Sequence, residues 1–148
     1  RNPKATRPWQ HVLEPLSGYL TLGQKLFSEN SKCKNQSFNF GPLEEVNQSV
    51  GDLITEMTKY WPEAKSEVQQ NIESSKPEST LLKLSCEKSH QLLEWHAVLN
   101  FSETVRMTGE WYHSFYLKKS SNNISELTCK QIETFTKIAT QSNLAWTL

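Results

Sequence analysis

The 148-residue chain carries sixteen basic and sixteen acidic side chains, so its formal net charge is zero. That balance excludes the broad positive surface of a general nucleic-acid-binding domain, although one or two arginines suffice for a local anion site. Hydrophobic residues make up 36% of the chain and charged residues 22%, which predicts one folded domain over residues 1–148 rather than a disordered segment.

Cysteine usage and hydropathy favour a cytoplasmic protein. Three widely spaced cysteines predict free thiols, with neither a disulfide framework nor a zinc site. No apolar run approaches the ~20 residues of a membrane helix, and no signal-peptide pattern occurs. Because the chain begins with Arg1 rather than methionine, either a longer protein precedes it or an amino-terminal part was removed. Four Asn-x-Ser triplets leave a secreted glycoprotein as an alternative, but about two are expected by chance in this composition.

The first third of the chain predicts an extended segment, a helix and a short strand. Residues 1–12 should be irregular or extended, because Pro3 and Pro8 keep the residues before them out of helical geometry. Pro15 suits a first helical position, and apolar residues at helical spacing carry that helix to about Glu29. After a polar loop, Phe38–Phe40 alternates in the manner of a short strand that runs into a Gly-Pro turn.

The middle of the chain predicts two helices and two further short strands. Asn47 or Ser49 should cap a helix that ends near Trp61. The two strand candidates that follow are Glu67–Gln70 and Thr80–Leu84, and Ser85 should cap a short helix that Trp95 closes.

The last third predicts two longer helices. Ser102 is the expected cap of the first, and the second should begin near Glu126. Their predicted core-facing residues are Val105, Trp111, Tyr112, Phe115 and Tyr116 in the first helix and Ile132, Phe135, Ile138 and Ala139 in the second. The predicted class is therefore α+β, mostly helical with a few short strands.

Motifs that carry catalytic chemistry are absent from the sequence. The five glycines do not form the Gly-x-x-Gly-x-x-Gly turn of a dinucleotide site, and no tyrosine has a lysine four residues later. No nucleophile elbow, P-loop or His-Glu-x-x-His motif occurs, and the four histidines have no metal-ligand spacing. We therefore assign no catalytic, cofactor-binding or metal-binding residue to this chain.

Five stretches, in order along the chain, resemble enzymes that modify nucleotide sugars. The first, RNPKATRPWQHVLEPLSGY at residues 1–19, is similar nearly letter for letter to a signature of CDP-glucose 4,6-dehydratases, members of the extended short-chain dehydrogenase family. The other four resemble motifs common to the wider family and are Phe38–Pro42, Lys76–Leu84, Ser85–Trp95 and Thr104–Tyr112.

The resemblance implies the carboxy-terminal, substrate-binding part of such a dehydratase, without its NAD-binding Rossmann core. Enzymes of this family are lyases of polysaccharide biosynthesis that use NAD to convert CDP-glucose to CDP-4-keto-6-deoxyglucose. The NAD site would lie outside this segment, so the segment alone should be inactive, and residues 1–45 should pack against the NAD domain in cis or else self-associate. The alternative is a standalone, non-catalytic relic that binds a nucleotide sugar or a protein partner.

The expected ligand is a CDP-sugar, with neither nucleic acid nor membrane as a partner. Arg7 occupies the position of the family motif that grips the diphosphate, and a guanidinium fork matches phosphate oxygens; the alternative is a surface ion pair. Trp9 and His11 follow at alternate positions and could line the cleft, although Trp9 suits the core equally well. Glu78 occupies an acidic position that the resemblance places near the nucleotide, although the neighbouring histidine of the family pattern is missing. The predicted substrate-binding residues are thus Arg7, Trp9, His11 and Glu78.

Overall fold

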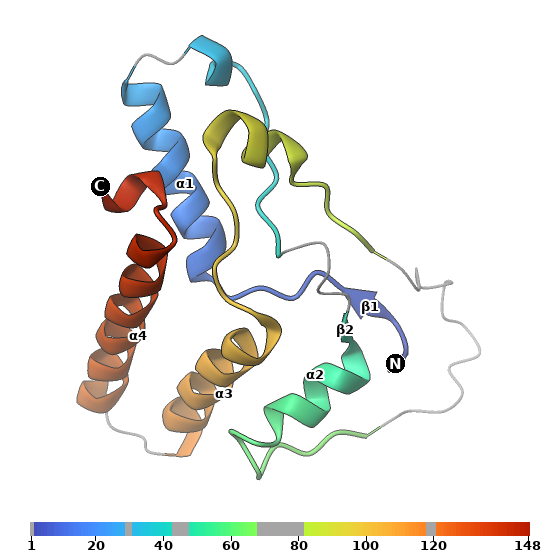
Figure 1. Ribbon diagram of the computed structural model, residues 1–148. Helices are drawn as coiled ribbons and strands as arrows, with labels where there is room; N and C mark the ends of the chain where they lie inside the picture. The colour runs from blue at the N-terminus through green and yellow to red at the C-terminus, as the bar shows by residue number, and fades with distance from the viewer. Residues whose placement is uncertain (1, 29–30, 43–47, 68–81, 118–120) are drawn as a thin grey trace.

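Helices dominate the described part of the chain, and two strands of two residues each pair there in a small sheet (Figure 1). The computed structural model describes residues 2–28, 31–42, 48–67, 82–117 and 121–148. In chain order, the elements are β1 (Thr6–Arg7), α1 (Leu13–Phe27), the 3-10 helix η1 (Ser31–Cys33), β2 (Gln48–Ser49), α2 (Val50–Met57), the π-helical turn η2 (Ser89–Leu93), α3 (Phe101–Leu117), α4 (Ser121–Gln141) and the 3-10 helix η3 (Ala145–Thr147). The predicted class, α+β and mostly helical, is confirmed. The last long helix, α4, begins five residues before the expected Glu126.

The strands fall elsewhere than the sequence predicts. β1 and β2 pair antiparallel, with Thr6 opposite Ser49 and Arg7 opposite Gln48. The strand expected at Phe38–Phe40 is wrong, because side-chain donors rather than a second strand bond its carbonyls. The Ser89 hydroxyl donates to the carbonyl of Asn39, and the Gln10 side-chain amide donates to that of Phe40 (3.0 Å). The side-chain amide of Asn39 donates to the Ser85 carbonyl (3.0 Å).

The two later strand candidates lie partly outside the described residues. Residues 68–81 are not described, while Glu67 and Leu82–Leu84 are described and form no strand.

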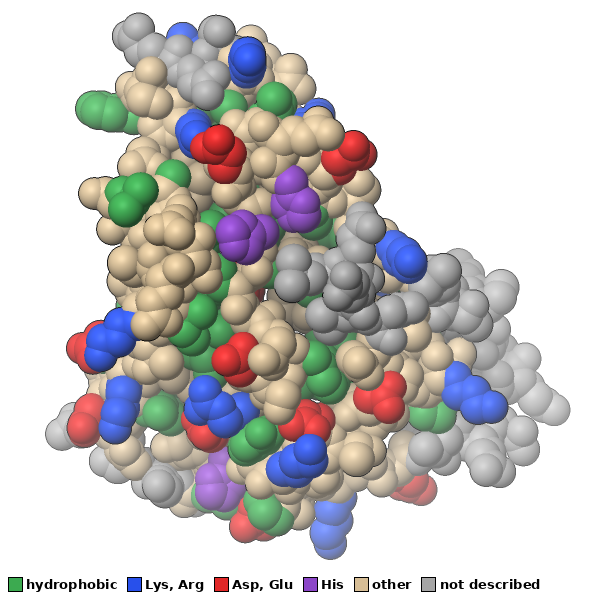
Figure 2. All heavy atoms as spheres, viewed as in Figure 1, with side chains coloured by type: hydrophobic (Ala, Val, Ile, Leu, Met, Phe, Trp, Pro, Cys, Tyr) green, Lys and Arg blue, Asp and Glu red, His purple; other side chains and the backbone are tan. Residues whose placement is uncertain are grey.

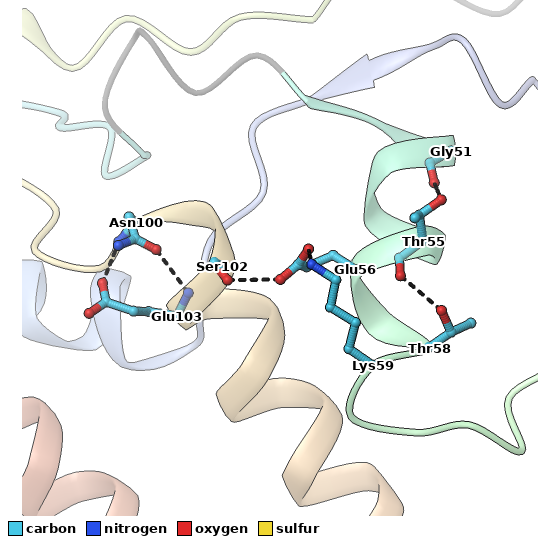
Figure 3. Close-up of polar contacts among 8 residues, drawn as sticks. All are labelled: Gly51, Thr55, Glu56, Thr58, Lys59, Asn100, Ser102 and Glu103. Atoms are coloured by element: carbon cyan, nitrogen blue, oxygen red, sulfur yellow. Dashed lines mark hydrogen bonds and ion pairs between the residues drawn. The ribbon is translucent and has the colours of Figure 1, made fainter.

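Two reciprocal side-chain caps fix where α2 and α3 begin. The Ser49 hydroxyl accepts from the Asp52 N–H (3.1 Å) and the Asp52 carboxylate accepts from the Ser49 N–H (2.9 Å), which confirms Ser49 as a cap. The predicted cap of α3 at Ser102 is wrong. Asn100 and Glu103 exchange the equivalent pair of bonds, both 2.9 Å, and Ser102 instead donates to Glu56 of α2 (2.8 Å; Figure 3).

The core gathers around Trp95, which follows η2 and is fully buried. Its ring meets Phe40 edge-on at 4.9 Å, and its indole N–H donates to the Ser17 hydroxyl of α1 (2.9 Å). Trp146 near the end of the chain donates to the same hydroxyl (3.1 Å) and stacks on Phe135 of α4. The last residues of the chain therefore lie against α1 (Figure 1) and close the core on that side.

The aromatic side of α3 faces outward, contrary to the prediction. Val105 and Met107 are buried, but Tyr112, Phe115 and Tyr116 are 44%, 50% and 54% exposed. Helical periodicity shows which residues of α3 share a face. It does not show which face the other helices cover. Ile132 of α4, also predicted to face the core, is 45% exposed, whereas Phe135 and Ala139 are buried as predicted.

Charges are mixed over the surface, as the zero net charge suggests. Figure 2 shows Lys and Arg side chains interspersed with Asp and Glu on the visible face. Cys33 and Cys86 are buried and Cys129 is exposed, all three as free thiols. Within the described residues, no helix combines the length and apolarity needed to cross a bilayer.

Candidate functional site

Arg7 lies in β1, where pairing with β2 fixes the backbone on which its side chain is mounted. One guanidinium nitrogen, Nη1, donates to the carbonyl of Thr6 at 2.7 Å. The side chain is half-buried. This contact ties one end of the guanidinium to the backbone of the strand.

Trp9 and His11 continue from β1 toward α1, and the structure gives them different surroundings. The Trp9 indole N–H donates to the Gln48 carbonyl at 3.0 Å, which fastens the ring to β2. His11 is buried, and its Nδ1 accepts the N–H of Leu13 at 3.3 Å. Burial lowers the pKa of His11 below its ordinary 6.5, so the ring is neutral at pH 7. Because Nδ1 is an acceptor, the proton of that neutral ring lies on Nε2.

A cavity of about 590 Å³ opens where the amino-terminal end of α1 meets α3 and α4. Its walls come from three places along the chain: Gln10, His11, Val12, Leu13 and Leu16; Thr108, Trp111 and Tyr112; and Thr128, Gln131 and Ile132. Of the predicted site residues, His11 lines this cavity, and Arg7 and Trp9 do not. Glu78 lies outside the described residues.

Glu14 is the residue that the sequence reasoning overlooked. It is 1% exposed, and its Oε1 accepts the backbone N–H groups of Val98 (2.9 Å) and Leu99 (2.7 Å). Its Oε2 is buried and has no hydrogen-bond partner among the described residues. Burial raises the pKa of Glu14 to about 7, against the two backbone hydrogen bonds and with a smaller contribution from Glu103. Glu14 thus joins the first turn of α1 to the segment that leads into α3.

A glutamate in the first helical turn ordinarily suggests only a favourable helix-dipole interaction. Glu14 and Val98 are 84 positions apart, so patterns within a short stretch of sequence cannot indicate the hydrogen bond between them. Within the described residues, no group of His, Cys, Asp and Glu side chains is arranged to hold a metal ion.

The chain is similar to part of a known enzyme. No family model matches the chain. The CDP-glucose 4,6-dehydratase of Salmonella typhimurium is 36% identical over 115 residues, which make up 78% of this chain and 32% of that enzyme. The chain therefore spans about a third of the length of the relative it matches. Over most of its own length, the chain is related to part of a nucleotide-sugar dehydratase.

Proposed function

We propose that this chain is the CDP-sugar-binding part of a CDP-glucose 4,6-dehydratase. The observation that carries the proposal is the 36% identity over 115 residues to the Salmonella typhimurium enzyme of that name. The ligand would be CDP-glucose, and the product would be CDP-4-keto-6-deoxyglucose. This segment would bind the substrate, and an NAD-binding part of the same polypeptide would hold the cofactor.

Arg7 is the group we assign to the diphosphate. It is a half-buried guanidinium on a paired strand, so its position is better defined than that of a cation on a mobile loop. The planar guanidinium fork matches the oxygens of a diphosphate and can meet two of them side by side. Trp9 would flank the ligand from a ring held in place by Gln48, and His11 would meet its uncharged part.

The outer face of α1 supports a further domain as the neighbour of residues 1–45. Val12, Leu16, Leu20 and Phe27 recur at helical spacing and are 62%, 45%, 55% and 92% exposed. An apolar stripe of this kind marks an interaction surface more often than a solvated face. In the proposed enzyme, the NAD-binding part would cover it, and the bound NAD would supply and take back the hydride. Glu78 stays a proposed ligand contact.

Calorimetric titration with CDP-glucose, CDP and dTDP-glucose tests the proposal. We expect preferential binding of the CDP ligands and a ten- to hundredfold weakening in Arg7→Ala, which corresponds to roughly 1.4–2.8 kcal/mol. Arg106→Ala is the matched control, because Arg106 pairs with Glu110 on α3 at 3.3 Å and should leave binding unchanged. Equal weakening in both variants, or no preference for cytidine ligands, would count against the proposal.

A further inference from the structure

The cavity between α1, α3 and α4 has the size and walls of a small-molecule site. Its volume of about 590 Å³ falls within the ~300–1,000 Å³ typical of such sites. Trp111 and Tyr112 line it from α3, and Val12 and Leu16 line it from the start of α1. A wall that combines aromatic and aliphatic side chains suits the faces of a ring-shaped ligand.

No lysine, arginine, aspartate or glutamate occurs among the described residues that line this cavity. A phosphate group that entered would lose its hydration without meeting a cation, which costs several kcal/mol. The cavity is therefore suited to an uncharged group. The wall residues with polar side-chain groups, besides the Trp111 indole, are Gln10, His11, Thr108, Tyr112, Thr128 and Gln131.

Existing hydrogen bonds determine what these polar residues can still offer. The hydroxyls of Thr108 and Thr128 donate to backbone carbonyls of their own helices, at 2.8 and 2.7 Å. The Trp111 indole N–H donates to Thr128 (2.9 Å), and the Gln131 amide donates to the carbonyl of Met107 (2.7 Å). The threonine hydroxyls therefore present acceptor lone pairs, and Gln131 keeps its amide oxygen.

Gln10 and His11 line the amino-terminal side of the cavity. The Gln10 amide donates to the carbonyl of Phe40 (3.0 Å), and its Oε1 is buried without a partner among the described residues. The His11 ring, whose Nδ1 is occupied by Leu13, carries its proton on Nε2. The second N–H of each glutamine amide and the Tyr112 hydroxyl add further donors, so the wall contains both donors and acceptors.

We propose that this cavity binds an uncharged ring that carries hydrogen-bonding groups. Within the proposed function, on which the identity of the ligand rests, a nucleotide sugar has two such parts, its aminopyrimidine base and its hexose. The site is distinct from the diphosphate contact at Arg7, which is not among the lining residues. It follows the Arg7 strand closely in sequence, since Gln10 and His11 are three and four residues further on.

Nuclear magnetic resonance on the full 148-residue chain tests this inference directly. Cytidine and methyl glucoside represent the two candidate rings, and inorganic pyrophosphate is the charged control. We expect one of the two neutral ligands to shift the Trp111 indole resonance, assigned through Trp111→Phe, together with the amides of Thr108 and Gln131, in a saturable manner. Pyrophosphate should leave those three resonances in place.

A substitution that fills the cavity should weaken binding of the neutral ligand. Ile132→Trp adds bulk at a wall position that is 45% exposed, so the fold should tolerate it, and we expect at least tenfold weaker binding of the neutral ligand. Glu133→Trp adds the same bulk at the next, exposed position, which is not part of the wall, and should bind as the parent does.

Outcomes for the cavity and for the proposed function are separable. If CDP-glucose binds through Arg7 while millimolar cytidine and methyl glucoside leave the cavity resonances unmoved, the cavity inference is overturned and the function stands. If a neutral ligand binds and Ile132→Trp blocks it, the cavity inference holds, even where Arg7→Ala leaves CDP-glucose binding intact and so overturns the diphosphate assignment. Equal binding to the Ile132→Trp and Glu133→Trp proteins would also refute the cavity site.

Discussion

Replacement of Glu14 by glutamine should remove a large part of the pH dependence of stability. Burial raises the pKa of this carboxyl from 4.5 to about 7, so the folded chain holds a proton that the unfolded chain releases near pH 4.5. The stability associated with that proton is fully present below about pH 4.5 and is lost as the pH rises through about 7. The difference between the two pKa values corresponds to about 3 kcal/mol in the free energy of unfolding.

Glutamine keeps an oxygen that can accept the N–H groups of Val98 and Leu99, and it cannot ionise. We therefore expect Glu14→Gln to match the parent within about 1 kcal/mol at pH 5 and to be more stable by about 1–3 kcal/mol at pH 8. Urea unfolding of both proteins at the two pH values measures this, since the difference between them cancels the titration of every other group.

Glu14→Ala is the control for the hydrogen bonds themselves. It leaves two N–H donors without their acceptor in the interior, so it should lose about 2–4 kcal/mol at both pH values. The reasoning fails if Glu14→Gln is no more stable than the parent at pH 8, or if its stability falls between pH 5 and pH 8 as steeply as that of the parent.

Two pairs of substitutions test the packing of α1 and the start of α3. A Cβ at Gly18 would lie 2.3 Å from the buried Phe40 ring, so Gly18→Ala should cost about 1–3 kcal/mol of unfolding free energy. Gly23→Ala, with nothing within 4 Å of the new methyl, should gain up to about 1 kcal/mol; thermal unfolding compares the two, and equal effects would contradict the packing. Asn100→Ala should lose about 1 kcal/mol through the missing cap of α3, whereas Ser102→Ala should lose less; the reverse order in chemical denaturation would restore Ser102 as the cap.

Local sequence signals predicted the helices better than the strands. Pro15 and the leucines after it indicate α1, and the Ser49–Asp52 pair marks the start of α2, because these signals depend on residues within a turn of one another. Phe38–Phe40 has the alternation of a strand, but a strand needs a partner strand, and the side chains of Ser89 and Gln10 bond its carbonyls instead. Strand formation is decided by tertiary contacts that alternation does not contain.

The candidate site shows the same limit. Arg7 and Trp9 lie on an extended segment, as the prolines predict, and the structure adds the partner strand that holds them. The cavity beside His11 could not be foreseen, because it exists only where α3 and α4 approach the start of α1. The burial of Glu14 is equally invisible, since the groups that bury it come from distant positions.

A chimeric enzyme tests the proposed function most directly. The segment of the Salmonella typhimurium dehydratase that matches this chain would be replaced by the chain, and formation of the 4-keto-6-deoxy product from CDP-glucose would be measured. We expect the chimera to convert CDP-glucose and to lose most of its kcat/KM when Arg7 is replaced by alanine, while Arg106→Ala retains it. A chimera that folds and binds NAD but neither binds nor converts CDP-glucose would contradict the assignment of this chain as the CDP-sugar-binding part.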